Sequence, residues 1–329
     1  MALNKINLIR PQAFNNKVIF IDGFSGSGKS MIAPIVSSFH SSELWQLEHL
    51  FETCLTLYSL EEISLKATEN LIKMFVDKHA INLMIGRNIN YRETDDSSAQ
   101  KNLLEERYIM RSKGPEGDKA TEMINTKKPI NIFMTHDILG ISSPLFSSLG
   151  DKLKLFIVPI RHPYWLLENW VNNLWYERVG KDPRELSITY EFNGRIYPSY
   201  AKGWEDKYDN CSPYEKAIEI IYLHQKTLSK SYSEAIESKI LLIPFEKFAT
   251  NPEKFIRQIN SKLNSKKSDS TNRIMKKMNV PREFSEDFIS KQKKSLFNTL
   301  KTNKISTEYK KLLEELAYSY ETKYLEIKT

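Results

Sequence analysis

The sequence predicts an α/β protein of three layers, in which helices cover both faces of a central, mostly parallel sheet. Short apolar runs rich in β-branched residues alternate along the chain with long helical segments, and this alternation is typical of parallel sheets. The polar residues that stand out follow directly after the apolar runs. Because ligands of such sheets bind beyond the carboxyl ends of the strands, the sequence also predicts a ligand site at one edge of the sheet.

Three short apolar runs in the first half of the chain are expected to be strands: residues 17–22, 81–85 and 130–134. Helical sequences lie between them, at residues 29–39, 43–60 and 59–78. The last of these opens with a candidate capping box, Ser59 with Glu62 three residues on. The polar residues 87–100 are expected to form a long loop.

The second half of the chain continues the alternation. Two further strands are expected at residues 153–160 and 240–244, and helices at residues 163–178, 212–238, from 251 onward and 307–327. The helix that begins at Ser212 has the clearest start, because Ser212 is followed by Pro213 at the first helical position and by Glu215 at the capping-box position.

The composition is that of an ordinary globular protein. Of 329 residues, 40% are hydrophobic and 27% are charged, which excludes a wholly disordered or fibrous chain. We expect one α/β domain over residues 1–262, with residues 263–329 packing on it as a basic segment and a C-terminal helix. The two cysteines exclude a disulfide framework and a multi-cysteine zinc site.

The chain shows no signal for a membrane or for export. No apolar run reaches the roughly 20 residues of a membrane span, and residues 1–16 lack the apolar core of a signal peptide. We therefore expect a cytoplasmic protein without a transmembrane segment. The sequence carries no signal for the oligomeric state.

The net charge of +7 is concentrated in one segment. Residues 262–304 contain twelve basic and four acidic side chains, so the rest of the chain carries a formal charge of −1. A protein that binds nucleic acids usually presents a broad basic surface. The charge distribution therefore argues against a nucleic-acid partner.

The strongest motif lies between the first strand and the first helix. Residues 23–30, Gly-Phe-Ser-Gly-Ser-Gly-Lys-Ser, fit the phosphate-loop pattern G-x-x-x-x-G-K-[ST] in full. Its glycines let backbone N–H groups converge on phosphate oxygens, and the helix that follows adds its positive N-terminal end. The predicted donor-binding residues of this loop are Gly23, Phe24, Ser25, Gly26, Ser27, Gly28, Lys29 and Ser30.

The order of motifs resembles that of the sulfotransferase family, which has a P-loop-related α/β fold and uses 3′-phosphoadenosine-5′-phosphosulfate (PAPS) as donor. The phosphate loop follows the first strand, Thr135-His136 ends a central strand, and Arg161-His162-Pro163 ends the next as Arg-x-Pro. Residues 242–252 look like a later strand-to-helix element of the family. The likeness runs from about residue 17 to residue 260.

The resemblance implies a reaction and roles for single residues. The protein would transfer a sulfuryl group from PAPS to a hydroxyl of a carbohydrate, lipid or small-molecule acceptor, with His136 as general base. The phosphate-loop motif adds Lys29, which would act in catalysis by stabilising charge on the departing phosphate oxygen. Arg161 would bind the 3′-phosphate, and Asn169 stands where the family has a second 3′-phosphate ligand, a Ser. No metal is expected.

The chain also departs from the family pattern. The loop lacks the upstream cation of the family and has a lysine of nucleotide-kinase type. The family's C-terminal Arg-Lys-Gly segment is missing as well. Lys291, Lys293 and Lys294 could return over the 3′-phosphate in its place, or could form a solvated basic face.

Two other classes of function stay open at this point. The first is an ATP-dependent kinase of a small molecule, in which Lys29 binds the phosphates of Mg-ATP while Ser30 and Asp137 hold Mg²⁺. The second is a nucleotide-binding regulatory protein without transfer activity. His136 and Arg161 also have ordinary structural interpretations, as a strand-end histidine bonded to the backbone and as an ion pair at a helix start.

The acceptor cannot be identified from motifs. Residues 87–100 and 180–210 are the candidate acceptor-contacting segments, and a solvated loop is an equal interpretation of the first. Trp165, Trp170 and Trp175 recur every five residues, a spacing that does not keep one helical face. They therefore predict packing in the core or in an acceptor groove and not a stacking platform.

Overall fold

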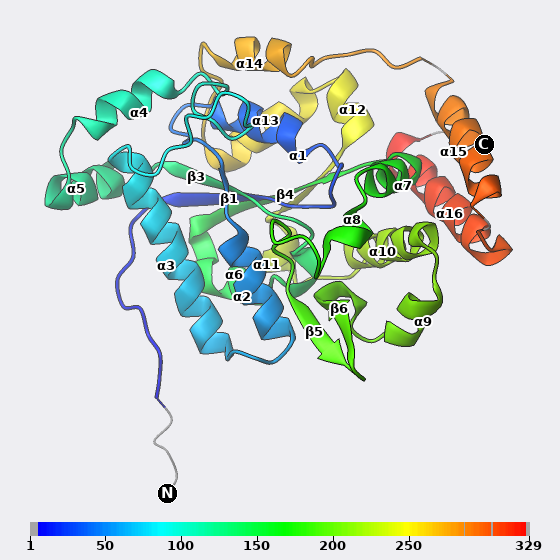
Figure 1. Cartoon of the computed structure of the whole chain (residues 1–329). Coiled ribbons are helices and arrows are strands. Elements are labelled where there is room, and N and C mark those ends of the chain that lie inside the picture. Colours follow the sequence, from blue (N-terminus) through cyan, green and yellow to red (C-terminus); the bar gives the residue numbers. More distant parts are fainter. Residues whose placement is uncertain (1–5, 286, 304, 327–329) are drawn as a thin grey trace, which may run out of the picture.

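The computed structural model describes residues 6–285, 287–303 and 305–326. Five parallel strands form the central sheet in the order β2-β3-β1-β4-β7, and helices cover both faces (Figure 1). The strands are β1 (Lys17–Ile21), β2 (Gln46–Leu47), β3 (Ile130–Met134), β4 (Leu153–Ile160) and β7 (Ile240–Pro244). The predicted three-layer α/β fold is confirmed.

The alternation of side chains along β1 builds a core on each face of the sheet. Ile19 and Ile21 belong to one buried cluster, and Val18 and Phe20 to the other. The first face is covered by α1 (Lys29–Ser37), α12 (Phe245–Thr250), α13 (Glu253–Leu263) and α14 (Thr271–Lys277). The second is covered by α2 (His49–Ser59), α3 (Leu65–Met84) and α6 (Ser143–Leu149).

A third cluster of buried side chains joins the C-terminal helices to the middle of the chain. It is formed by α7 (Pro163–Asn172), α10 (Pro213–Leu228), α15 (Phe288–Thr302) and α16 (Thr307–Tyr320). The predicted capping box at the start of α10 is confirmed, because the Ser212 and Glu215 side chains each bond the other's backbone N–H. The boundary between domain and C-terminal segment at residue 262 stays a prediction.

The remaining elements lie around these layers. They are α4 (Glu105–Ser112), α5 (Gly117–Lys127), α8 (Trp175–Arg178), the antiparallel hairpin β5 (Thr189–Phe192) and β6 (Arg195–Pro198), α9 (Glu205–Asn210) and α11 (Glu234–Glu237). Residues 87–100 form turns without a helix or strand, as predicted. Among the described helices, none combines the length and the apolar character that crossing a membrane requires.

Several predicted elements are wrong. Residues 81–85 are not a strand, because Ile81 to Met84 are the last turn of α3, and the sheet takes its edge strand from Gln46 and Leu47 instead. The helix expected from residue 43 begins at His49. The next helix begins after Ser64, whose hydroxyl accepts from the Ala67 N–H, so the Ser59–Glu62 capping box is absent.

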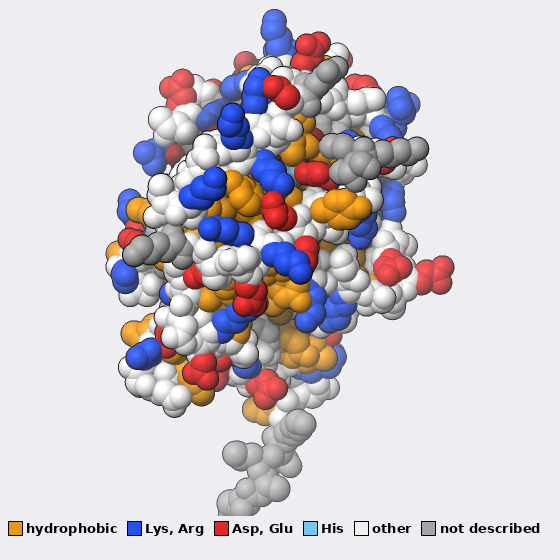
Figure 2. All heavy atoms as spheres, turned by 90° about the vertical axis from the view of Figure 1, so that its right-hand side faces the viewer, with side chains coloured by type: hydrophobic (Ala, Val, Ile, Leu, Met, Phe, Trp, Pro, Cys, Tyr) orange, Lys and Arg blue, Asp and Glu red, His pale blue; other side chains and the backbone are white. Residues whose placement is uncertain are grey.

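Some predicted features fall outside the described residues: Glu286 and Lys304 of the basic segment, residue 327 of the last helix, and residues 1–5. The described part of the basic segment carries compensating charges. Lys291 pairs with Asp287 at 2.8 Å and Lys293 with Glu314 at 3.0 Å. On this side of the molecule, Lys and Arg side chains are interspersed with Asp and Glu (Figure 2). The charge excess therefore does not form one basic patch on that face.

Candidate active site

A cavity of about 550 Å³ lies at the carboxyl ends of β1 and β3. Phe24 and Ser25 of the phosphate loop, which follows β1, line one part of it, and His136 and Asp137, which follow β3, line another. The remaining walls come from α2, from α7 and α8, from residues between 178 and 200, and from the aliphatic side chains Leu47, Ile138, Ile141 and Ile220. The predicted site residues of two strand ends thus meet in one cavity.

The phosphate loop needs its glycines for two reasons. Gly26 and Gly28 have positive φ values of 85° and 104°, a region that residues with a side chain rarely adopt. Neighbouring side chains also fill the space beside them, since a Cβ on Gly26 would lie 2.7 Å from Asn169 and one on Gly28 would lie 2.4 Å from Phe245. The loop therefore packs directly against α7 and α12.

The other loop residues divide into buried and exposed ones. Phe24 is buried and stacks on Trp170, with ring centroids 4.7 Å apart. Ser27 is buried, and its hydroxyl has no partner among the described residues. Ser30 is exposed and is not among the residues that line the cavity.

Lys29 is buried at the start of α1. Its ammonium donates to the carbonyls of Gly23 and Phe24, in the loop itself. Burial lowers the pKa of Lys29 to about 8, although the carboxylates of Asp22, Glu52 and Asp137 act in the opposite direction. A bound anion in the loop would compete with the two carbonyls for this ammonium.

Arg161 and Asn169 lie on the α7 side of the loop. Arg161 Nη1 donates to the Gly26 carbonyl at 2.9 Å, and the guanidinium lies over the rings of Phe245 (4.1 Å) and Trp165 (5.1 Å). Its Nε is buried without a partner among the described residues. Arg282 approaches the same Phe245 ring at 5.8 Å. Arg161 and Asn169 therefore lie beside Gly26, and Arg282 lies near the Phe245 ring that Arg161 covers.

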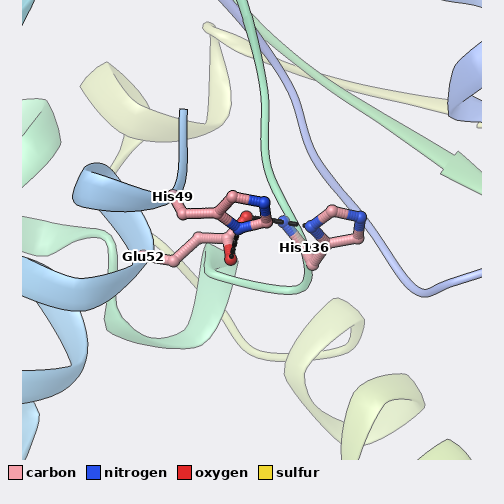
Figure 3. A group of neighbouring side chains, drawn as sticks. All are labelled: His49, Glu52 and His136. Atoms are coloured by element: carbon pink, nitrogen blue, oxygen red, sulfur yellow. Dashed lines mark hydrogen bonds and ion pairs between the residues drawn. The ribbon is translucent and has the colours of Figure 1, made fainter. Parts of the chain in front are cut away.

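His136 is held by a carboxylate that the sequence analysis missed. Its Nδ1 and its backbone N–H both lie 2.9 Å from Glu52 Oε1, and His49 Nδ1 lies 3.2 Å from Oε2. Figure 3 shows the Glu52 carboxylate joined by dashed lines to both histidines and the Nε2 of His136 on the side away from the carboxylate. Burial acts to raise the pKa of Glu52, but the hydrogen bonds from His136 and His49 outweigh it and lower the pKa to about 2. An anionic Glu52 accepts from Nδ1–H and leaves Nε2 of a neutral His136 as the acceptor nitrogen.

Asp137 has a different partner. It has a positive φ of 52°, and its Oδ1 lies 2.6 Å from Nδ1 of the buried His224 on α10. Burial acts to raise the pKa of Asp137, but His224 and Lys29 lower it overall. The adjacent Asp22 accepts from the Thr135 hydroxyl and from the backbone N–H groups of Ile138 and Leu139, which ties the two strand ends together.

The His49, Glu52 and His136 side chains are of types that bind zinc. One ligand atom from each lies within 4.8 Å of the others. Both histidines direct Nδ1 at the carboxylate oxygens. In this arrangement the three groups satisfy one another by hydrogen bonds, so the geometry does not require a cation.

The candidate acceptor segments behave differently from each other. Among the described residues that line the cavity, none belongs to 87–100, whereas residues 182, 184–188, 199 and 200 contribute to it. Trp170 and Trp175 line the cavity, and Trp165 lies on the Arg161 side. The three tryptophans therefore face two different parts of the site, as their five-residue spacing suggested.

The comparisons with known proteins give a likeness in structure alone. No family model matches the chain, and no curated protein matches it. The chain is similar to a solved sulfotransferase domain from the curacin biosynthetic pathway, with 15% identity and a TM-score of 0.40 over 92% of this chain and 98% of that one. It is also similar to the sulfotransferase domain of the Synechococcus PCC 7002 olefin synthase, with 12% identity and a TM-score of 0.41 over 95% and 98% of the two chains.

Proposed function

We propose that the protein is a PAPS-dependent sulfotransferase that acts on a hydroxyl group. The observation that carries this proposal is the meeting of two kinds of chemistry in one cavity. Phe24 and Ser25 of the phosphate loop line one part of it, and His136, which Glu52 orients and whose Nε2 bonds no described residue, lines another. A loop that binds an anionic donor and a base for an acceptor are the two requirements of group transfer to a hydroxyl.

The donor end has the features that a 3′-phosphate calls for. Arg161 Nε is buried without a partner among the described residues, and a buried unpaired charged donor costs free energy unless an anion satisfies it. Asn169 and Arg282 lie close by. We infer that Arg161 and Asn169 bind the 3′-phosphate of PAPS and that Arg282, from the basic segment, assists them. This assigns to Arg282 the role that we had considered for Lys291, Lys293 and Lys294.

The acceptor end has the features of a general base. PAPS supplies, when bound, an electrophilic sulfuryl group at its phosphosulfate. His136 Nε2 takes the acceptor's proton, Glu52 stabilises the imidazolium that results, and Lys29 with the loop amides of Ser25 to Ser30 stabilises charge on the departing phosphate oxygen. Lys29 leaves the carbonyls of Gly23 and Phe24 when it binds the anion.

The rival function is an ATP-dependent kinase. It is favoured by Gly28, Lys29 and Ser30, which complete the phosphate-loop motif of nucleotide-binding proteins. A kinase of this type needs Ser30 and Asp137 at one Mg²⁺ ion. Asp137 is instead ion-paired with His224 at 2.6 Å. The geometry therefore supports the sulfotransferase better.

One titration decides between the two donors. Adenosine 3′,5′-bisphosphate and ATP are each titrated into the protein by calorimetry, with and without Mg²⁺. We expect tight binding of the bisphosphate that does not depend on Mg²⁺. Preference for Mg-ATP would overturn the sulfotransferase proposal. Binding of the bisphosphate without transfer of labelled sulfate to any acceptor in a hydroxyl library would favour a regulatory protein instead.

A further inference from the structure

The backbone on both sides of Arg161 is held by side chains from the end of α16 and the start of α12. On one side, the Ile160 carbonyl oxygen lies 3.2 Å from the Tyr320 hydroxyl. On the other side, the His162 N–H donates to Glu246 Oε1 at 3.2 Å. The Tyr320 hydroxyl also donates to Oε2 of the same carboxylate. Tyr320 and Glu246 therefore fix the turn that presents Arg161.

The contacts of α16 with this turn are buried. Tyr320 is 2% exposed and Glu246 is 5% exposed. Glu321, the next residue, reaches the same turn, because its Oε1 lies 3.0 Å from Nε2 of the buried His162. α16 also packs beside α7, the helix that follows Arg161 (Figure 1). The C-terminal helix thus supports the residue to which we assign the 3′-phosphate.

Glu246 is placed to compete with an anion for Arg161. It follows Phe245, whose ring lies under the Arg161 guanidinium at 4.1 Å. Burial lowers the pKa of Arg161, and Glu246 exerts the strongest of the charge effects that oppose this shift. The hydrogen bond that Arg161 makes to a described residue nevertheless goes to the Gly26 carbonyl, and its Nε has no partner among the described residues. Both oxygens of Glu246 accept from other donors instead.

We propose that Tyr320 is a positioning residue of the donor site, whose hydroxyl keeps the Glu246 carboxylate away from Arg161 and so leaves the guanidinium available to the 3′-phosphate. This inference rests on the proposed function. A carboxylate and a phosphate compete for the same guanidinium donors. A buried carboxylate whose two oxygens already accept hydrogen bonds gains less from pairing with the guanidinium. Burial and the Glu246 charge raise the pKa of Tyr320 well above its usual value, so the hydroxyl keeps the proton that it donates.

The test measures the preference of each variant for adenosine 3′,5′-bisphosphate over adenosine 5′-monophosphate, as the ratio of the two dissociation constants. Tyr320→Phe removes the hydroxyl alone and frees Oε2 of Glu246 to pair with Arg161. We expect the preference to fall about tenfold, with the affinity for the monophosphate unchanged. Adding Glu246→Gln removes the competing charge and keeps an oxygen for the His162 N–H, so the double variant should regain the wild-type preference. A side chain that only supported the fold would not give this recovery.

Tyr318→Phe is the control on the same helix, because Tyr318 is 55% exposed, and it should keep the wild-type preference. Glu246→Gln alone should keep or increase the preference, and a loss there would show that the carboxylate assists Arg161 and overturn the proposal. An unchanged preference in Tyr320→Phe, or a double variant as weak as Tyr320→Phe, would overturn it too. If the wild type itself does not prefer the bisphosphate, the 3′-phosphate assignment of the proposed function is wrong, and this inference is wrong with it.

Discussion

The proposed donor end and the proposed acceptor end of the site are built in different ways. At the donor end, eight consecutive residues supply the loop, Arg161 joins it from just before α7, and Asn169 joins it from the second half of that helix. At the acceptor end, α2, the turn after β3, the α7–α8 region and residues 178–200 each contribute one or a few side chains. The first depends on local backbone geometry and the second on tertiary packing. Binding of the donor and turnover of the acceptor should therefore respond to different substitutions.

The sharpest separation of the two ends is expected for His136→Ala. Removal of a general base lowers the rate by about 10²- to 10⁴-fold, and His136 is not part of the phosphate loop. We expect kcat to fall by that factor and the affinity for adenosine 3′,5′-bisphosphate to stay within twofold of wild type. The exposed His40 provides the control, and His40→Ala should leave both unchanged. Turnover retained by His136→Ala would contradict its assignment as base.

Glu52→Gln tests a residue of the acceptor end that contacts the proposed base, His136, and acts through it. A neutral amide no longer stabilises the imidazolium and no longer fixes one tautomer of His136. Replacement of a side chain that orients a functional histidine typically lowers activity by about 10- to 100-fold. We expect kcat to fall by that factor, and the lost rate to recover in part in Glu52→Asp. A role in folding alone would lower thermal stability without a change in kcat for the folded protein.

The donor end should show a pH dependence of its own. The pKa of Lys29 is lowered to about 8 in the free protein, so the ammonium that an anion needs is lost as the pH rises through 8. Affinity for the bisphosphate should therefore fall by up to about tenfold per pH unit above 8. Lys29→Met should bind more weakly and lack this dependence. If the affinity of the wild type for the bisphosphate does not change from pH 7 to pH 9.5, the proposed role of the Lys29 ammonium in binding is wrong.

The smallest effects are expected for features outside the two ends. Arg92→Ala should leave the acceptor KM unchanged, because residues 87–100 are not among the described cavity residues.

Treatment with EDTA should leave turnover unchanged too. Loss of turnover that Zn²⁺ restores would instead identify His49, Glu52 and His136 as metal ligands.

The same contrast explains what the sequence could predict. The phosphate loop, the Thr135-His136 strand end and Arg161 were found from sequence because each is a short motif next to an apolar strand. Glu52 and His49 lie on a helix with no motif around them, and only packing brings them to His136. Arg282 was hidden in a basic segment where twelve cations look alike. The strand expected at 81–85 failed because a short apolar run fits a buried helix end equally well.

Recognition of the 3′-phosphate by Arg161 is tested most directly by one pair of ligands that differ in that group alone. The dissociation constants of adenosine 3′,5′-bisphosphate and of adenosine 5′-monophosphate are measured for the wild type and for Arg161→Ala. We expect the wild type to prefer the bisphosphate by at least about 100-fold, and Arg161→Ala to lose most of that preference while binding the monophosphate as before. Equal affinity of the wild type for the two nucleotides, or a preference that survives in Arg161→Ala, would contradict the account.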